Sequence, residues 1–294
     1  MKIARAGWTS ASFLVYAGAL IVLAAAFAWL GVISAHHGKG AFAGWAVLFY
    51  ATAEACAVGL LIRGRRVAAG LFAFVSVGIL AVMVGAFLHW FGWLHTGSAP
   101  FSGFHWGALA IELSTLLAAL VAIRVFRFPL LVAIAAGVGW YFVTDVLSSG
   151  GNWSAWVTLL VGLAFFFTGL AIDGGESRLY GFWMHAAAGL TIGGALLYFW
   201  HLSDTQWTLI IVTSLVYIAV GAAARRSSYA VLGAVGLALA TGHFALNATF
   251  GIGDGELFGP PQDWVGPVAY LCLGFFLALV GLLLSRRGDA AETA

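Results

Sequence analysis

Long apolar segments, separated by short polar or glycine-containing turns, recur along the whole chain. Each segment is about twenty residues long, which as an α-helix matches the ~30 Å hydrocarbon core of a bilayer. Windows of about 19 residues predict spans at roughly 12–33, 41–62, 67–89, 105–124, 129–147, 153–172, 180–200, 207–224, 229–250 and 265–285. We therefore expect an all-α fold, a polytopic transmembrane bundle of about ten spans that forms one domain over residues 1–294.

Composition supports a lipid environment for these segments. Hydrophobic residues make up 63% of the chain and charged residues only 8%, which lies outside the range of soluble domains. The loops are too short to fold alone, and no phosphate-binding, zinc-protease or serine-hydrolase motif occurs in a usable context. The first apolar run, about 22 residues, exceeds the 7 to 15 of a signal peptide, so we expect a retained span. The predicted partner is the lipid bilayer, with no nucleic acid.

Basic residues mark alternate loops. Of the 13 lysines and arginines, only Lys39 falls on the side opposite to the others. Positive charge is retained on the cytoplasmic side of membrane proteins. The pattern predicts that both termini are cytoplasmic in a bacterial plasma (inner) membrane.

Two carboxylates lie deep in apolar segments, Glu54 in 41–62 and Glu112 in 105–124. An ionisable group at such a depth is costly and indicates a functional site. Tyr50, one turn before Glu54, and Thr115, just under a turn after Glu112, are expected hydrogen-bond partners on the same helix faces. His105, two turns before Glu112, would begin a proton or ion path from the outer surface. With no basic residue deep in any span, we expect at least one of the two acids to be protonated at neutral pH. Interhelical hydrogen bonding is the alternative role.

Most tryptophans and histidines fall near the predicted outer boundary. An interfacial aromatic belt explains this distribution, and a ligand site at the outer rim, using Trp140, Asp145 and His105, is the alternative. The histidines and acids show no spacing that predicts a metal site, and His185 and His243 lie at depths too different for a bis-histidine haem. No metal and no cofactor are predicted. Glycines in the seventh and ninth segments, including Gly189 and Gly193, predict close helix packing.

Residues 126–147, 174–199 and 224–244 resemble a group of bacterial multi-pass integral membrane proteins of unknown function, in which a Phe-Pro start, a Trp with an Asp in one span and a Tyr-x-Phe-Trp start of a later span recur. The similarity covers about 44–287 and implies a compact helical bundle with no assigned activity. Three functions therefore stay open: a proton-coupled small-solute transporter or channel, a non-catalytic membrane scaffold or accessory subunit, and, third, a membrane enzyme. Oligomeric state is not predicted.

Overall fold

The computed structural model describes residues 18, 21, 24–33, 36–93, 106–147, 150–173, 178–223, 227–250 and 264–292, and these residues contain helices and turns but no strand. Residues Ala24–Ile33 are helical. The helices that follow are α2 (Lys39–Ile62), α3 (Arg66–Trp90), α4 (Trp106–Phe126), α5 (Leu131–Leu147), α6 (Gly151–Ile172), α7 (Arg178–Phe199), α8 (Asp204–Ala223), α9 (Ser227–Phe250) and α10 (Val265–Glu292). The all-helical class predicted from the apolar segments is confirmed for the described part of the chain.

Seven of the described helices, α2, α3, α4, α6, α7, α8 and most of α9, are long and apolar enough to cross a membrane. The apolar stretches in Ala24–Ile33, α5 and Val265–Gly281 are shorter. These are the helices of a membrane-embedded protein, because apolar segments of this length bury their backbone hydrogen bonds internally and leave apolar side chains for lipid. The number of spans and the side on which each terminus lies stay predictions.

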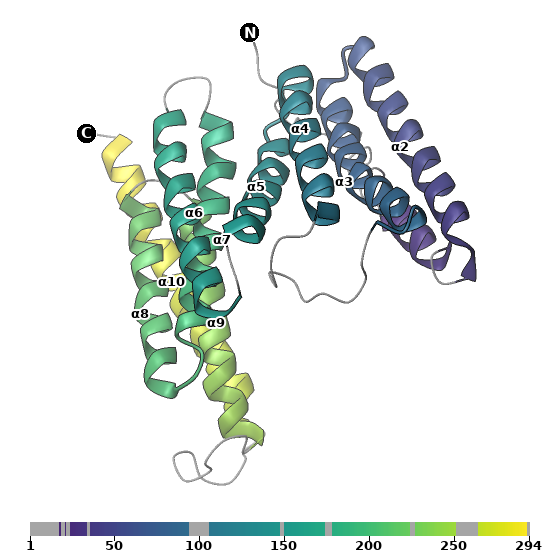
Figure 1. The fold of residues 1–294 in the computed structure, drawn as a ribbon. Coiled ribbons are helices and arrows are strands. Elements are labelled where there is room, and N and C mark those ends of the chain that lie inside the picture. The colour runs from purple at the N-terminus through teal and green to yellow at the C-terminus, as the bar shows by residue number, and fades with distance from the viewer. Residues whose placement is uncertain are drawn as a thin grey trace. The chain divides into compact units, whose positions relative to one another are not determined.

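The chain divides into two compact units, residues 1–187 and 188–294, so the boundary falls within α7. In the first unit each helix from α2 to α6 packs against the next along the chain (Figure 1). The centre of this packing is built largely from small side chains, including Ala57, Ala73 and Ala119. Small residues allow helix backbones to approach closely, which is how helices associate where lipid removes the hydrophobic driving force.

A tight turn joins α4 to α5. Arg127 takes a left-handed conformation with φ 53°, and Pro129 follows two residues later. The Phe128 side chain lies directly against the Cα of Gly70 on α3, where a Cβ would come within 2.9 Å of Phe128 Cδ1. The turn is therefore fixed against a third helix, and this sets the relative positions of α4 and α5.

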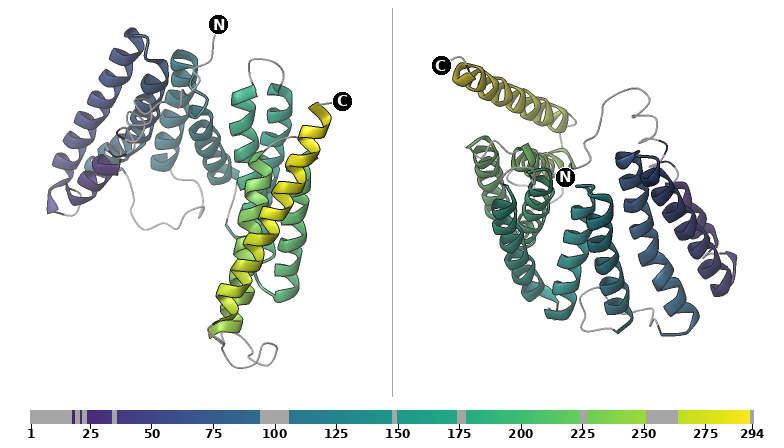
Figure 2. Two further views of the ribbon diagram at one scale, coloured as in Figure 1. Left: turned by 180° about the vertical axis from the view of Figure 1, so that it is seen from behind. Right: turned by 90° about the horizontal axis from the view of Figure 1, so that it is seen from above.

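In the second unit α9 packs against both α8 and α10, as can be followed in Figure 2. Glycines make these approaches possible: a Cβ at Gly233 would lie 2.5 Å from the Ser214 carbonyl oxygen, and Gly236 lies directly against Ser214 Oγ. The packing role predicted for the ninth-segment glycines is thus confirmed. Of the predicted pair in the seventh segment, Gly189 contacts Leu232, whereas Gly193 faces open space.

Candidate functional site

Two buried carboxyl groups lie on the adjacent helices α4 and α5. The Glu112 side chain is 5% exposed and the Asp145 side chain 4% exposed, and the two groups interact electrostatically. Both carboxyl oxygens of Glu112, and Oδ2 of Asp145, lack a hydrogen-bond partner among the described residues. Buried polar atoms are normally paired, so this cluster is an exception that points to function.

The α4–α5 turn explains why these two residues meet. Glu112 precedes the end of α4 at Phe126 by 14 positions, and Asp145 follows the start of α5 at Leu131 by the same 14 positions. At ~1.5 Å per residue each lies about 21 Å from the turn, which places them level in an antiparallel hairpin. Sequence reasoning paired Glu112 with Glu54 and missed Asp145, although this equal spacing was available.

Two other polar residues of α5 lie near the pair, and neither α4 nor α5 carries a basic residue close to it. Tyr141 interacts electrostatically with both carboxyl groups. The hydroxyl of Thr144, next to Asp145 and 1% exposed, has no hydrogen-bond partner within the described part of the chain. The one basic residue of α4 and α5 is Arg124, 12 positions beyond Glu112 and hence about 18 Å along the helix. The pair therefore lacks a counter-charge on its own two helices.

Glu54 belongs to a different cluster, between α2 and α3. The Ser76 hydroxyl donates a hydrogen bond of 2.8 Å to Glu54 Oε2, and Tyr50 interacts with the same carboxyl electrostatically. No hydrogen bond from Tyr50 to Glu54 is found among the described residues, and the carboxyl accepts one from Ser76 on the neighbouring helix. Glu54 therefore interacts with Ser76, whereas Glu112 interacts with Asp145.

The partner predicted for Glu112 is also wrong. The hydroxyl of Thr115 donates to the backbone carbonyl of Ile111 at 2.6 Å, four residues earlier on its own helix. Threonine hydroxyls commonly bond to the i−4 carbonyl inside helices, where the acceptor is always in reach. Thr115 is buried beside the acid without bonding to it.

The predicted rim site is not assembled by the residues that the structure describes. Asp145 is buried against α4 rather than exposed at a rim, and the Trp140 indole N–H donates to Thr158 Oγ1 on α6 at 3.0 Å. His105 lies outside the described residues. Trp140 therefore joins α5 to α6 within the helix packing.

Asp173 and His185 form a carboxylate–histidine pair that links the end of α6 to α7. Asp173, which ends α6, lies with Oδ2 2.9 Å from His185 Nε2. His185 is fully buried, and two glycines make room for the pair: Gly169 lies against the imidazole ring and Gly181 against Asp173 Oδ1. Hydropathy alone does not connect Asp173, which follows an apolar segment, to His185. The glycines four residues before each partner were the available signal.

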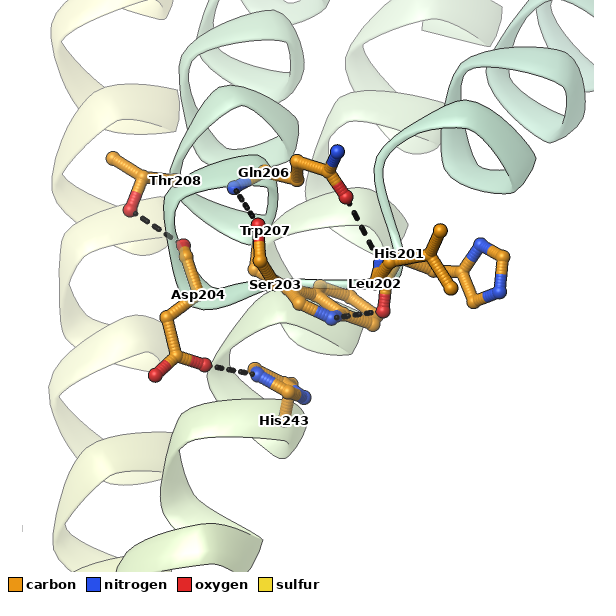
Figure 3. A network of polar contacts seen from close by, with 8 residues as sticks. All are labelled: His201, Leu202, Ser203, Asp204, Gln206, Trp207, Thr208 and His243. Carbon is orange, nitrogen blue, oxygen red and sulfur yellow. Dashed lines mark hydrogen bonds and ion pairs between the residues drawn. The ribbon is translucent and has the colours of Figure 1, made fainter. Parts of the chain in front are cut away.

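Figure 3 shows a fourth polar cluster, where α8 begins. Asp204 Oδ1 lies 2.9 Å from His243 Nε2 of α9, and the Trp207 ring stacks on the His243 ring with centroids 4.4 Å apart. The Trp207 indole N–H in turn donates to the His201 carbonyl at 3.1 Å. Asp204 is exposed, so this network ties α8 to α9 at an accessible end of the unit.

Neither a metal-binding arrangement nor similarity to other proteins assigns a function to these clusters. Within the described ranges no group of three or more His, Cys, Asp or Glu side chains is placed to hold a metal ion. Comparison with protein-family models, curated proteins and solved structures found no match to this chain. The class that the fold supports is a helical membrane protein, and the resemblance to bacterial multi-pass proteins stays a prediction.

Proposed function

We propose that this protein is a proton-coupled small-solute transporter or channel in which Glu112 and Asp145 share the coupling proton. The observation that carries the proposal is the pair itself: two buried carboxyl groups, level on adjacent helices, with no basic residue near them on those two helices. The sequence predicted a path through Glu54 and Glu112. The proposal keeps Glu112 and replaces Glu54 with Asp145 as its partner.

Electrostatics favours one shared proton. Burying a single ionised carboxylate costs on the order of several kcal/mol, even after the protein around it relaxes. Two like charges on adjoining side chains add repulsion, so a carboxyl pair of this kind loses its protons in separate steps. A pair that holds one proton in its resting state is able to gain or lose one as conditions on either side of the membrane change.

Glu54 is proposed as a second proton-carrying group. Its carboxyl accepts a hydrogen bond from Ser76 and is half-buried, so it has a partner that Glu112 lacks. The charge asymmetry of the loops supports a bacterial inner membrane, ten spans and cytoplasmic termini.

Proton flux into reconstituted vesicles tests the proposal. Vesicles that enclose a pH-sensitive dye are given an inward-directed potential with potassium and valinomycin, and the rate of acidification is recorded. Wild-type protein is expected to acidify the vesicles, and Glu112→Gln and Asp145→Asn to lower that rate at least tenfold, because the amides keep the shape but remove the titratable proton. The matched control is Asp204→Asn, which changes an exposed acid outside the pair.

The results separate two functions. Unchanged flux in both Glu112→Gln and Asp145→Asn refutes a role of the pair in conduction. Absence of flux in the wild-type protein, together with normal folding, would instead favour the alternative of a membrane scaffold or accessory subunit. That alternative draws on the close alanine packing of the first unit and the short turns.

A further inference from the structure

An apolar cavity lies within the second unit, where the second half of α7 meets α8 and α9. Its volume is about 230 Å³, and its lining includes Gly193, Gly194, Ser214, Tyr217 and Leu239. Every lining residue belongs to residues 188–294, so the cavity is complete inside one compact unit. None of the polar clusters described above contributes to it.

Missing side chains on α7 create this space. An added Cβ at Gly193 or at Gly194 would meet no atom within 4 Å. One turn earlier the helices do touch, because Gly189 lies against Leu232 and its carbonyl accepts a hydrogen bond of 3.4 Å from the Tyr217 hydroxyl. Contact on one turn followed by open space on the next leaves a pocket beside Gly193 that opens at the exposed Gly194.

Two neighbouring hydroxyl side chains of α8, Thr213 and Ser214, line this largely apolar pocket, and Ser214 is the more deeply buried. Ser214 is 6% exposed, lines the cavity, and makes no hydrogen bond in the described structure. Gly236 presses against its Oγ and fixes the direction of the side chain. A ligand oxygen that bonds to the Ser214 hydroxyl would form a hydrogen bond that this group does not make within the described part of the protein.

The position of Ser214 along α8 indicates the class of ligand. Ser214 lies 10 residues from the start of α8 and 9 from its end, which is about 14 to 15 Å from either end and hence at mid-span. The head group of a phospholipid belongs at the bilayer boundary, not at this depth. The cavity is also smaller than the ~300–1,000 Å³ usual for sites of drug-sized ligands. Exposed apolar side chains at its rim, Leu190 and Leu239, leave it open to the hydrocarbon region.

We propose that this cavity binds a compact lipophilic alcohol or ketone that enters from the bilayer core. Its chain fills the space beside Gly193 and Gly194, and its one oxygen forms a hydrogen bond with the Ser214 hydroxyl, which can donate to a carbonyl or accept from an alcohol. The proposal is independent of proton transfer by Glu112 and Asp145.

Photo-crosslinking with decanol that carries a diazirine in its chain tests this site. The purified full-length protein in lipid nanodiscs is irradiated with the probe, and labelled peptides are located by mass spectrometry. Label is expected on the segments that line the cavity, at 189–200, 210–217 and 232–239. Unlabelled decanol should compete for it, and a decane of equal length without the hydroxyl should compete about five- to tenfold less well, as loss of one hydrogen bond predicts.

Four variants give the test its specificity. Gly193→Leu and Gly194→Leu each fill open space, so they are expected to fold and to abolish the label. The matched control Gly274→Leu, on α10, also enters open space but does not line the cavity and should leave the label unchanged. Ser214→Ala should remove the preference for decanol over decane while leaving decane competition intact.

Label that persists in both folded leucine variants would place the probe elsewhere and overturn the site. Equal competition by decanol and decane in the wild-type protein would overturn the role of Ser214. Two filling variants guard against failure of one to fold, and thermal unfolding of each shows whether it folds.

Discussion

Gly169 offers the sharpest test of the packing around the Asp173–His185 pair. A Cβ added at Gly169 would lie 2.9 Å from His185 Cε1 and 3.0 Å from Nδ1, closer than real Cβ contacts allow. His185 is fully buried, so its ring cannot swing away without disturbing the bond to Asp173. We expect Gly169→Ala to destabilise the protein through overpacking, which typically costs ~1–3 kcal/mol.

A second effect acts in the opposite direction. Alanine in a helix interior is favoured over glycine by roughly 0.5–1 kcal/mol. In a His185→Ala background the steric conflict is gone, so Gly169→Ala should stabilise the protein by about that amount. The coupling between the two substitutions is therefore expected to be about 1–3 kcal/mol, the size of the overpacking itself.

The assay is reversible unfolding in mixed detergent micelles with increasing dodecyl sulfate, followed by circular dichroism, for the wild type, both single variants and the double variant. Gly137→Ala, in α5, is the matched control, because a Cβ there meets nothing within 4 Å and should cause no loss of stability. A free energy of unfolding that changes equally for Gly169→Ala in both backgrounds would refute the proposed contact with His185.

Two further predictions concern topology and the Glu54 cluster. Single cysteines at Ser98 and Gly255, which lie in sequence outside the described residues, should react in intact cells with an impermeant thiol reagent, and protection of both would contradict cytoplasmic termini. Ser76→Ala removes the donor to Glu54 and should lower the free energy of unfolding by roughly 0.5–1.5 kcal/mol, since the half-buried Glu54 carboxyl loses a hydrogen bond. In Glu54→Gln protein the same serine substitution should cost less, and equal costs in both backgrounds would show that the bond contributes nothing.

Helix positions were predictable from the sequence because lipid imposes a length and an apolar composition on each segment. The predicted segment 67–89 corresponds to α3 at Arg66–Trp90, and 41–62 to α2 at Lys39–Ile62. The start of α8 was placed three residues late, at 207 instead of Asp204. Polar residues obscure that boundary: Ser203 Oγ accepts a bond from the Gln206 N–H at 3.4 Å, which caps the helix before its apolar part begins.

The polar clusters were harder to predict, since hydropathy does not encode which helix faces which. Glu112 stood out because it lies deep in an apolar run, but its partner, Asp145, lies two residues from the end of α5 and resembled an interfacial charge. Asp173 was hidden in the same way by its polar turn. The partner of each acid became evident only from the way two helices are aligned. For Glu112 that alignment follows from counting residues on either side of the tight α4–α5 turn. Glu54 shows the converse, because its depth was visible while its partner, Ser76, is an ordinary helix residue.

The short α5 has a consequence for the membrane around this protein. Its 17 residues extend about 25 Å, some 5 Å less than the hydrocarbon thickness of an average bilayer. The sequence predicts that α5 crosses the membrane, and a bilayer that matches so short a span would thin, which draws the lipid–water boundary toward the end that carries Asp145. Lipid chain length would then set how far the carboxyl pair lies from bulk water. Short-chain lipids shorten that distance, and long-chain or sterol-rich membranes lengthen it.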